Sequence, residues 1–88
     1  MLERIHERID VITVYKKMGA TVMPYKLKWN GKEYKISKLG YHHKVKRGNV
    51  FHHIFSVCSD DLFFRLDFDT ETMYWSVEEV SDASSYQS

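Results

Sequence analysis

Hydrophobic and polar residues alternate along most of the chain with a period of two. Between Leu62 and Phe68, for example, Leu62, Phe64, Leu66 and Phe68 alternate with Phe63, Arg65 and Asp67. This is the period of a β-strand that buries one face. The same interpretation fits four other stretches, separated by turn-forming residues: 21–29, 32–39, 50–58 and 73–80. We expect Trp29, Met73, Trp75 and Val77 to point inward. No stretch predicts a helix long enough to cross between parallel strands.

Asn30-Gly31 is the strongest local signal, because this pair favours the positive φ values of the tight turn that joins two antiparallel strands. Pro24 lacks an amide donor and predicts a sheet edge or an irregularity. Gly40 predicts a bulge or a bend. Residues 44–49 (KVKRGN) are interpreted as an exposed loop.

The N-terminal segment supports two interpretations. Leu2, Ile5, Ile9 and Ile12 follow helical spacing, whereas residues 9–15 are rich in β-branched side chains that suit a strand. We expect a short helical turn over residues 2–7, followed by a strand over 9–15. Residues 83–88 are expected to form a flexible tail.

The resulting fold prediction is all-β. About six short strands form an antiparallel meander that curls into a small, partly open barrel, with the helical turn as an addition at the N-terminus. The chain has 88 residues, which is enough for a single domain, placed here at residues 1–82. Its 43% hydrophobic and 15% aromatic content makes a core plausible without a metal or a disulfide.

The single cysteine, Cys58, excludes an internal disulfide and is expected to be a small buried group. The charged N-terminus lacks the apolar stretch of a signal peptide, and no apolar run approaches the roughly 18 residues that span a membrane. These features favour a cytoplasmic protein without membrane contact.

The net charge of +1 conceals a strong asymmetry along the chain. Residues 1–50 contain twelve Lys and Arg against four Asp and Glu, whereas residues 51–88 contain one basic residue, Arg65, against eight Asp and Glu. The chain is therefore basic in one half and acidic in the other, which is relevant to partners rather than to fold.

The basic half contains the first candidate site. Cations interleaved with aromatic rings suit single-stranded nucleic acid, because phosphates attract cations and bases stack on flat rings. A solvated lysine face and a surface for an acidic protein are the alternatives. The candidate nucleic-acid-binding residues are Lys26, Lys28, Lys35, Lys44, Lys46, Arg47 and Tyr41.

Two histidine pairs form the second candidate site: His42, His43, His52 and His53. Adjacent residues in a strand point to opposite faces, so one histidine of each pair can share a face. A structural zinc site needs four ligands and a catalytic one needs three, so this metal hypothesis requires further ligands. A pH-responsive surface and ordinary packed histidines are the alternatives.

The acidic residues are interpreted as solvated positions in and around turns, where Asp caps backbone amides: Asp60, Asp61, Asp67, Asp69, Glu71, Glu78 and Glu79. No nucleophile lies at a known catalytic spacing, and no glycine pattern cradles phosphate. We therefore expect no enzymatic activity and no cofactor.

Several strand and turn residues also form a recognisable order: Ile9-x-Val11, Pro24, the run Leu27-Lys28-Trp29-Asn30-Gly31-Lys32-x-Tyr34-x-Ile36, Leu66-x-Phe68-Asp69, and Trp75-x-Val77-x-x-Val80-x-Asp82. Over residues 8–82 this order resembles a small bacterial β-domain family of unknown function, some members of which accompany translesion-polymerase-like proteins. The resemblance implies a small barrel-like domain of bacterial origin and supplies no catalytic residues.

The sequence thus favours a non-catalytic accessory or binding domain whose partner is a macromolecule, either nucleic acid or a protein of the DNA-repair type. A protein-interaction or self-associating domain and a histidine-based metal site remain alternatives.

Overall fold

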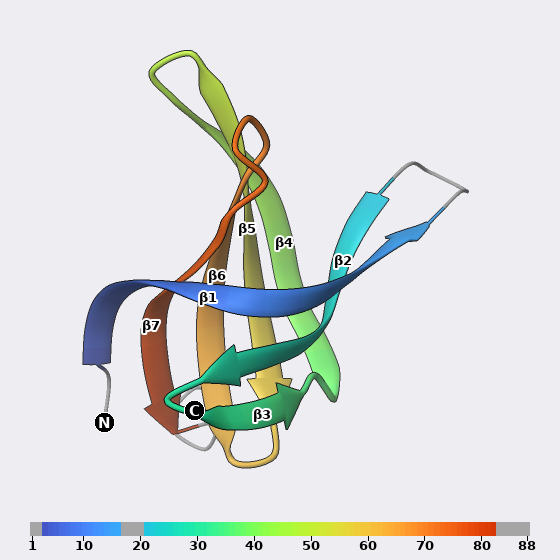
Figure 1. The fold of residues 1–88 in the computed structure, drawn as a ribbon, viewed down its shortest axis with the longest axis vertical. Coiled ribbons are helices and arrows are strands. Elements are labelled where there is room, and N and C mark those ends of the chain that lie inside the picture. Colours follow the sequence, from blue (N-terminus) through green and yellow to red (C-terminus); the bar gives the residue numbers. More distant parts are fainter. Residues whose placement is uncertain (1–2, 17–20, 83–88) are drawn as a thin grey trace.

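The structure, a computed structural model, describes residues 3–16 and 21–82, which form seven β-strands (Figure 1). The strands are β1 (Glu3–Lys16), β2 (Thr21–Trp29), β3 (Lys32–Lys35), β4 (Lys38–Arg47), β5 (Val50–Ser59), β6 (Leu62–Asp69) and β7 (Trp75–Asp82). The described part of the chain contains no helix, and therefore none that could cross a membrane.

All seven strands belong to one antiparallel sheet in the order β3-β2-β1-β7-β6-β5-β4. The sheet curls until its edge strands, β3 and β4, approach one another at one end, so the molecule is a half-barrel (Figure 1). The predicted all-β, partly open barrel is confirmed. It has seven strands rather than about six because residues 38–47 form a strand of their own.

Hydrogen bonds around the link between β3 and β4 close one end of the half-barrel, which we call the base. The Ile36 amide donates to the Tyr25 carbonyl of β2 (3.0 Å), and the Ser37 amide donates to the Cys58 carbonyl of β5 (2.9 Å). The Ser59 hydroxyl donates to the Lys35 carbonyl (2.7 Å). Both edges are therefore held together at the base, whereas β4 and the β1–β2 hairpin diverge toward the opposite end, the mouth (Figure 1).

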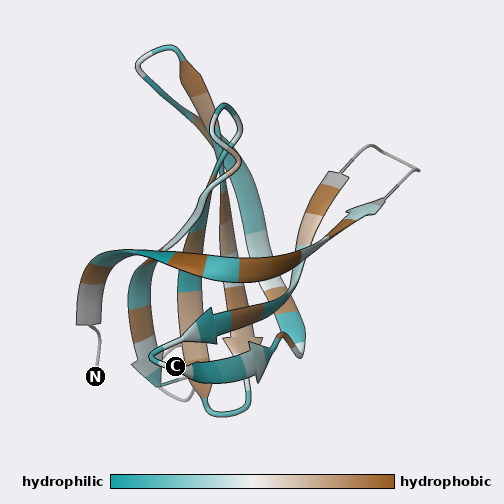
Figure 2. Cartoon of the chain, in the orientation of Figure 1, coloured by the Kyte–Doolittle hydropathy of each residue, from teal (hydrophilic) through white to brown (hydrophobic). Residues whose placement is uncertain are grey.

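The core fills the inside of the curled sheet, where hydrophobic residues from alternate positions meet. Figure 2 shows the alternation of hydrophobic and polar positions along the strands. At the base, the Trp29, Tyr34 and Phe64 rings pack with centroids 5.1–6.3 Å apart. Nearer the mouth, Trp75 packs against Phe55 and Phe68 at 5.5 and 4.7 Å. The predicted inward orientation of Trp29 and Trp75 is confirmed, since Trp75 is buried and Trp29 packs against the core.

The irregular positions follow the local chemistry of the sequence. Asn30 and Gly31 have φ values of 53° and 76°, so the predicted tight turn is confirmed. The register of β4 against β5 shifts between Leu39 and Tyr41, which places the predicted bulge at Gly40. The register of β1 against β2 shifts next to Pro24, as the missing amide donor predicted.

Three local predictions are wrong. The expected helical turn is strand from Glu3 onward, because pairing of Glu3 and Arg4 with Val80 and Glu79 on β7 outweighs the helical spacing. The expected loop at residues 44–49 is only the two-residue turn Gly48-Asn49, made possible by Gly48 at a φ of 62°. Met73 precedes β7 in a turn and is 62% exposed rather than inward. The predicted tail at 83–88 lies outside the described residues.

Candidate nucleic-acid interface

The fold places most of the lysines and most of the acidic residues on different strands. Residues 21–47, which comprise β2, β3 and β4, contain eight Lys and Arg and one acidic residue, Glu33. Residues 50–82 contain eight Asp and Glu and one basic residue, Arg65. β6 and β7 lie in the middle of the sheet, so Asp67, Glu78 and Glu79 lie away from its edges, whereas Asp60 and Asp61 in the β5–β6 turn lie beside Lys32 of β3. The lysine-bearing strands lie at both ends of the sheet and flank its open side, which we call the seam.

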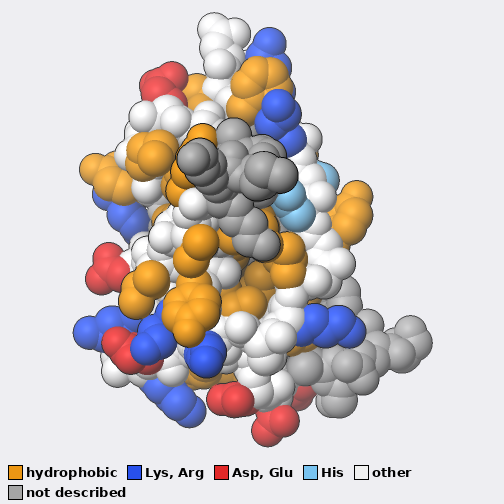
Figure 3. Space-filling model, turned by 90° about the vertical axis from the view of Figure 1, so that its right-hand side faces the viewer, with side chains coloured by type: hydrophobic (Ala, Val, Ile, Leu, Met, Phe, Trp, Pro, Cys, Tyr) orange, Lys and Arg blue, Asp and Glu red, His pale blue; other side chains and the backbone are white. Residues whose placement is uncertain are grey.

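Figure 3 views the molecule from the side of β4 and the β1–β2 hairpin. Lysine and arginine side chains lie at the top and along the lower part of this face, with acidic side chains among and below them. Hydrophobic side chains lie between them, and histidine lies near the middle. This mixture of cations and apolar rings is what a nucleic-acid chain requires of its binding surface.

Phe51 forms the clearest unit of this surface, near the mouth. It lies on the same face of β5 as His53 and Phe55, yet its ring is 45% exposed because no further strand covers it. Lys46 is its direct partner across the ladder, and the amines of Lys44 and Lys46 lie 4.8 and 5.7 Å from the ring centroid. The predicted residues Lys44 and Lys46 thus surround an aromatic ring that the sequence-based site did not include.

His42 and His53 lie directly below this unit, on the same inner face. Their Nε2 and Nδ1 atoms are 2.8 Å apart, so one ring donates a hydrogen bond and the other accepts it. The His42 ring stacks on Phe55 with a centroid distance of 4.3 Å and an interplanar angle of 3°. Burial lowers the pKa of both histidines, and nearby positive charge lowers it further: His43 acts on His42, and His42 and Lys44 act on His53. Both effects favour the neutral form of the two rings.

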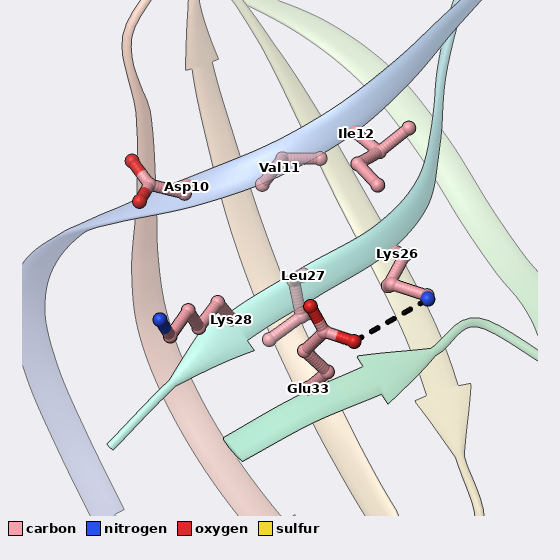
Figure 4. Close-up of a pocket in the computed structure, with 7 residues that line it drawn as sticks. All are labelled: Asp10, Val11, Ile12, Lys26, Leu27, Lys28 and Glu33. Carbon is pink, nitrogen blue, oxygen red and sulfur yellow. Dashed lines mark hydrogen bonds and ion pairs between the residues drawn. The ribbon is translucent and has the colours of Figure 1, made fainter. Parts of the chain in front are cut away.

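The predicted hairpin lysines lie together on the outer face of β2 and β3, but acidic residues accompany them. Lys26 faces Lys35 across the ladder, and Lys28 faces both Glu33 and Asp10. Figure 4 shows Glu33 between Lys26 and Lys28, with an ion pair of 3.4 Å to Lys26. The prediction that these lysines share a face is confirmed, and the carboxylates reduce the positive charge of that face.

A second exposed ring lies where β2 meets the base. Tyr25 is 44% exposed, and the Lys35 amine is 5.7 Å from its ring centroid. Tyr41, the aromatic residue predicted from the sequence, is 61% exposed but packs beside His43 at 5.0 Å. Because His43 alternates with the inward-facing His42, this pair lies on the outer face of β4.

Arg47 does not join the basic surface. Its guanidinium donates to Asp67 (2.6 Å) and to Glu78 (3.3 Å) on the outer face of the sheet. His52 adds a second contact to Asp67 through Nδ1 (2.7 Å). These two carboxylates hold the pKa of Arg47 above its usual value, although burial acts in the opposite direction.

The interpretation of Asp67 as a solvated acid is wrong. Asp67 is only 4% exposed and is neutralised by Arg47 from a strand two places away in the sheet. The position of Asp67 among the alternating residues of β6 indicated only that it faces outward. By contrast, Asp69 is a turn residue as predicted: its carboxylate accepts hydrogen bonds from the Glu71 and Thr72 amides, and the Thr72 bond is the main cause of its lowered pKa.

Beside this ion-pair network the outer face has an open hollow of about 320 Å³, lined by His6, Arg8, Arg47, His52, Asp67, Asp69, Thr72, Tyr74 and Ser76. Its two arginines are balanced by two aspartates. Arg47 is committed to Asp67 and Glu78, and Arg8 covers the Tyr74 ring at 3.8 Å. The hollow therefore offers no excess of charge to an ionic ligand.

The histidines are divided between the two faces of the sheet. His42 and His53 meet on the inner face, whereas His52 contacts Asp67 on the outer face, and His43 lies beside Tyr41. The prediction that one histidine of each pair shares a face is confirmed. Among residues 3–16 and 21–82, no three His, Cys, Asp or Glu side chains are grouped closely enough to hold a metal ion.

Comparison of the chain with protein-family models, curated proteins and solved structures gives no match. The resemblance to a bacterial β-domain family stays a prediction.

Proposed function

We propose that this domain is a non-catalytic binding module that holds nucleic acid along its lysine-rich seam. The observation that carries the proposal is the separation of charge by the sheet order. Basic strands flank the open side, and acidic strands form the back. A polyanion that approaches this side meets more cations than carboxylates, because Glu33 is the one acidic residue among the eight Lys and Arg of residues 21–47.

The cations of the seam differ in how free they are. Lys26 is paired with Glu33, and Lys28 lies opposite Asp10 and Glu33. The ion pairs found among the described residues do not include Lys44 or Lys46, whose amines lie over an aromatic ring. We therefore assign the larger share of phosphate contacts to Lys44 and Lys46.

The test is a titration of a labelled oligonucleotide, followed by fluorescence anisotropy over a series of salt concentrations. Phosphate contacts make the logarithm of the affinity fall linearly with the logarithm of salt concentration, by about 0.7–0.9 per contact. The double variant Lys44→Gln/Lys46→Gln should weaken binding and reduce this slope by roughly two contacts. The matched control, Lys26→Gln/Lys28→Gln, removes the same charge and should have the smaller effect.

Absence of salt-dependent binding by the unmodified protein would refute the proposal. Equal losses in the two double variants would show that net charge, not the seam, attracts the ligand. Light scattering at the same salt concentrations tests the alternative, in which the acidic back of one copy meets the basic seam of another. In that case, the mass at low salt would exceed that of a monomer.

A further inference from the structure

Two partly exposed aromatic rings border the seam, and each is accompanied by lysine. Phe51 has the amines of Lys44 and Lys46 at 4.8 and 5.7 Å, and Tyr25 has the amine of Lys35 at 5.7 Å. The pairs lie on different sides of the opening, since Tyr25 belongs to β2 and Phe51 belongs to β5 beside the edge strand β4. The same combination of a flat ring and a cation therefore occurs on both sides.

The exposure of Phe51 is notable because Phe55, further along the inner face of β5, is 0% exposed. Tyr25 lies at the register shift between β1 and β2, where Ile12 pairs with Lys26 and Thr13 pairs with Pro24, so it stands outside the alternation that buries Leu27. Exposed rings contribute little to the core, and a base can reach Phe51 if the flexible lysine amines over the ring move to its phosphates.

A ring beside a cation matches one nucleotide of a single strand, which presents a base and a phosphate. In a duplex the base faces are stacked inside and cannot reach a protein ring, so a stacking surface discriminates between the two forms. Resting on the proposed function, we infer that the seam selects single-stranded over double-stranded nucleic acid, with Phe51 and Tyr25 as the base-stacking residues.

The outer face provides a matched control. Tyr74 is 48% exposed and carries the Arg8 guanidinium 3.8 Å from its ring centroid, but it lies between the acidic strands β6 and β7. Tyr74→Leu therefore removes an exposed ring that has a neighbouring cation but lies outside the proposed binding surface.

The experiment compares the affinities of the variants Phe51→Leu, Tyr25→Leu and Tyr74→Leu for three probes at one salt concentration: oligo-dT, oligo-U and a duplex of the same length. Phe51→Leu should weaken binding of both single strands by about 5- to 150-fold, the range expected for one lost stacking contact. Its affinity for the duplex and its salt slope should not change. Tyr25→Leu should act in the same direction, and Tyr74→Leu should have no effect.

Phe51→Tyr preserves a flat ring and should retain the single-strand affinity, and circular dichroism verifies that each variant is folded. Salt-dependent binding with equal affinity for duplex and single strand, or equal losses in Phe51→Leu and Tyr74→Leu, would overturn this inference alone. If the unmodified protein binds none of the three probes, the proposed function fails and this inference fails with it.

Discussion

The base and the mouth of the half-barrel are built from the same sheet, but their inward-facing side chains have different surroundings. At the base, three aromatic rings, Trp29, Tyr34 and Phe64, pack against one another, and hydrogen bonds from residues 36, 37 and 59 tie the two edges together. At the mouth, the inner face carries the hydrogen-bonded pair His42 and His53 and the exposed Phe51, whose ring lies beside two lysines.

The difference shows how one small sheet can divide stability from binding. The closed end can bury its rings because strands and backbone bonds surround them, so it supplies the core. The open end lacks a covering strand, and its rings and cations are left for a partner. Truncation of the buried rings at the base should therefore cost the most stability, and changes to the exposed Phe51 and its lysines at the mouth should mainly affect binding.

The largest effect should come from Phe64→Ala at the base. Phe64 is 0% exposed, and truncation of a buried aromatic ring costs about 3–5 kcal/mol of unfolding free energy. Phe51→Ala at the mouth should cost about 1 kcal/mol or less, because its ring is already half exposed. Urea denaturation of both variants measures the contrast, and equal losses would contradict the division between base and mouth.

Arg47→Gln should have the next largest effect, because it leaves the buried Asp67 carboxylate with His52 as its remaining contact in this network. Loss of the hydrogen bond to a charged group should cost about 1.5–3 kcal/mol, toward the lower end because Arg47 is half exposed. Amide hydrogen exchange should show faster opening of the β4–β5 hairpin, which bears Phe51. Lys46→Gln, one residue away, should leave this exchange unchanged.

Gly31→Val tests the turn that joins β2 to β3. A Cβ at this position would meet no atom within 4 Å, so any loss of stability arises from the backbone alone. A β-branched residue at a φ of 76° should cost about 1–3 kcal/mol. Gly31→Asn, which tolerates positive φ, should lose much less. A melting temperature unchanged by Gly31→Val would argue against the turn geometry.

The smallest effect should be a pH dependence of stability from the mouth. His42 and His53 have pKa values below 6.5 in the folded state, so the unfolded chain binds protons more readily. Their contribution to stability is present above pH 6.5 and is lost as pH falls from 6.5 through the lowered folded-state pKa values. Protonation of both rings also removes the acceptor of their shared hydrogen bond.

Thermal melts between pH 7.5 and 5 measure this effect. The double variant His42→Gln/His53→Gln should show a weaker loss of stability on acidification than the unmodified protein. An identical slope in the two proteins would show that other groups cause the dependence.

The sequence predicted the parts of the fold that local chemistry determines. Alternation over Leu62–Phe68 assigned the inner and outer faces of β6, and Asn30-Gly31 identified the β2–β3 hairpin. The N-terminal segment was misassigned because its conformation depends on β7, at the other end of the described chain. Asp67 was misjudged for the same reason, since its partner Arg47 approaches only after β4, β5 and β6 have paired.

The candidate site shows the same limit. Lys44 and Lys46 could be selected by charge, and the pairing of His42 with His53 followed from strand alternation and a hairpin. Phe51 and Tyr25 could not be distinguished from core residues, because they occupy alternate positions identical in pattern to those of Phe55 and Leu27. The exposure of Phe51 depends on where the sheet stays open, and that of Tyr25 on the register shift between β1 and β2. Both are properties of strand pairing rather than of the local sequence.

The ladder between β1 and β7 also has a kinetic consequence. Every other ladder of the described sheet joins strands that are consecutive in the chain, whereas this one pairs Glu3 with Val80. The units β1–β3 and β4–β7 can each form through short turns, but joining them requires closure of a long loop, which slows folding. Until they meet, β1 and β7 expose unpaired edges, and these two strands are where aggregation competes with folding.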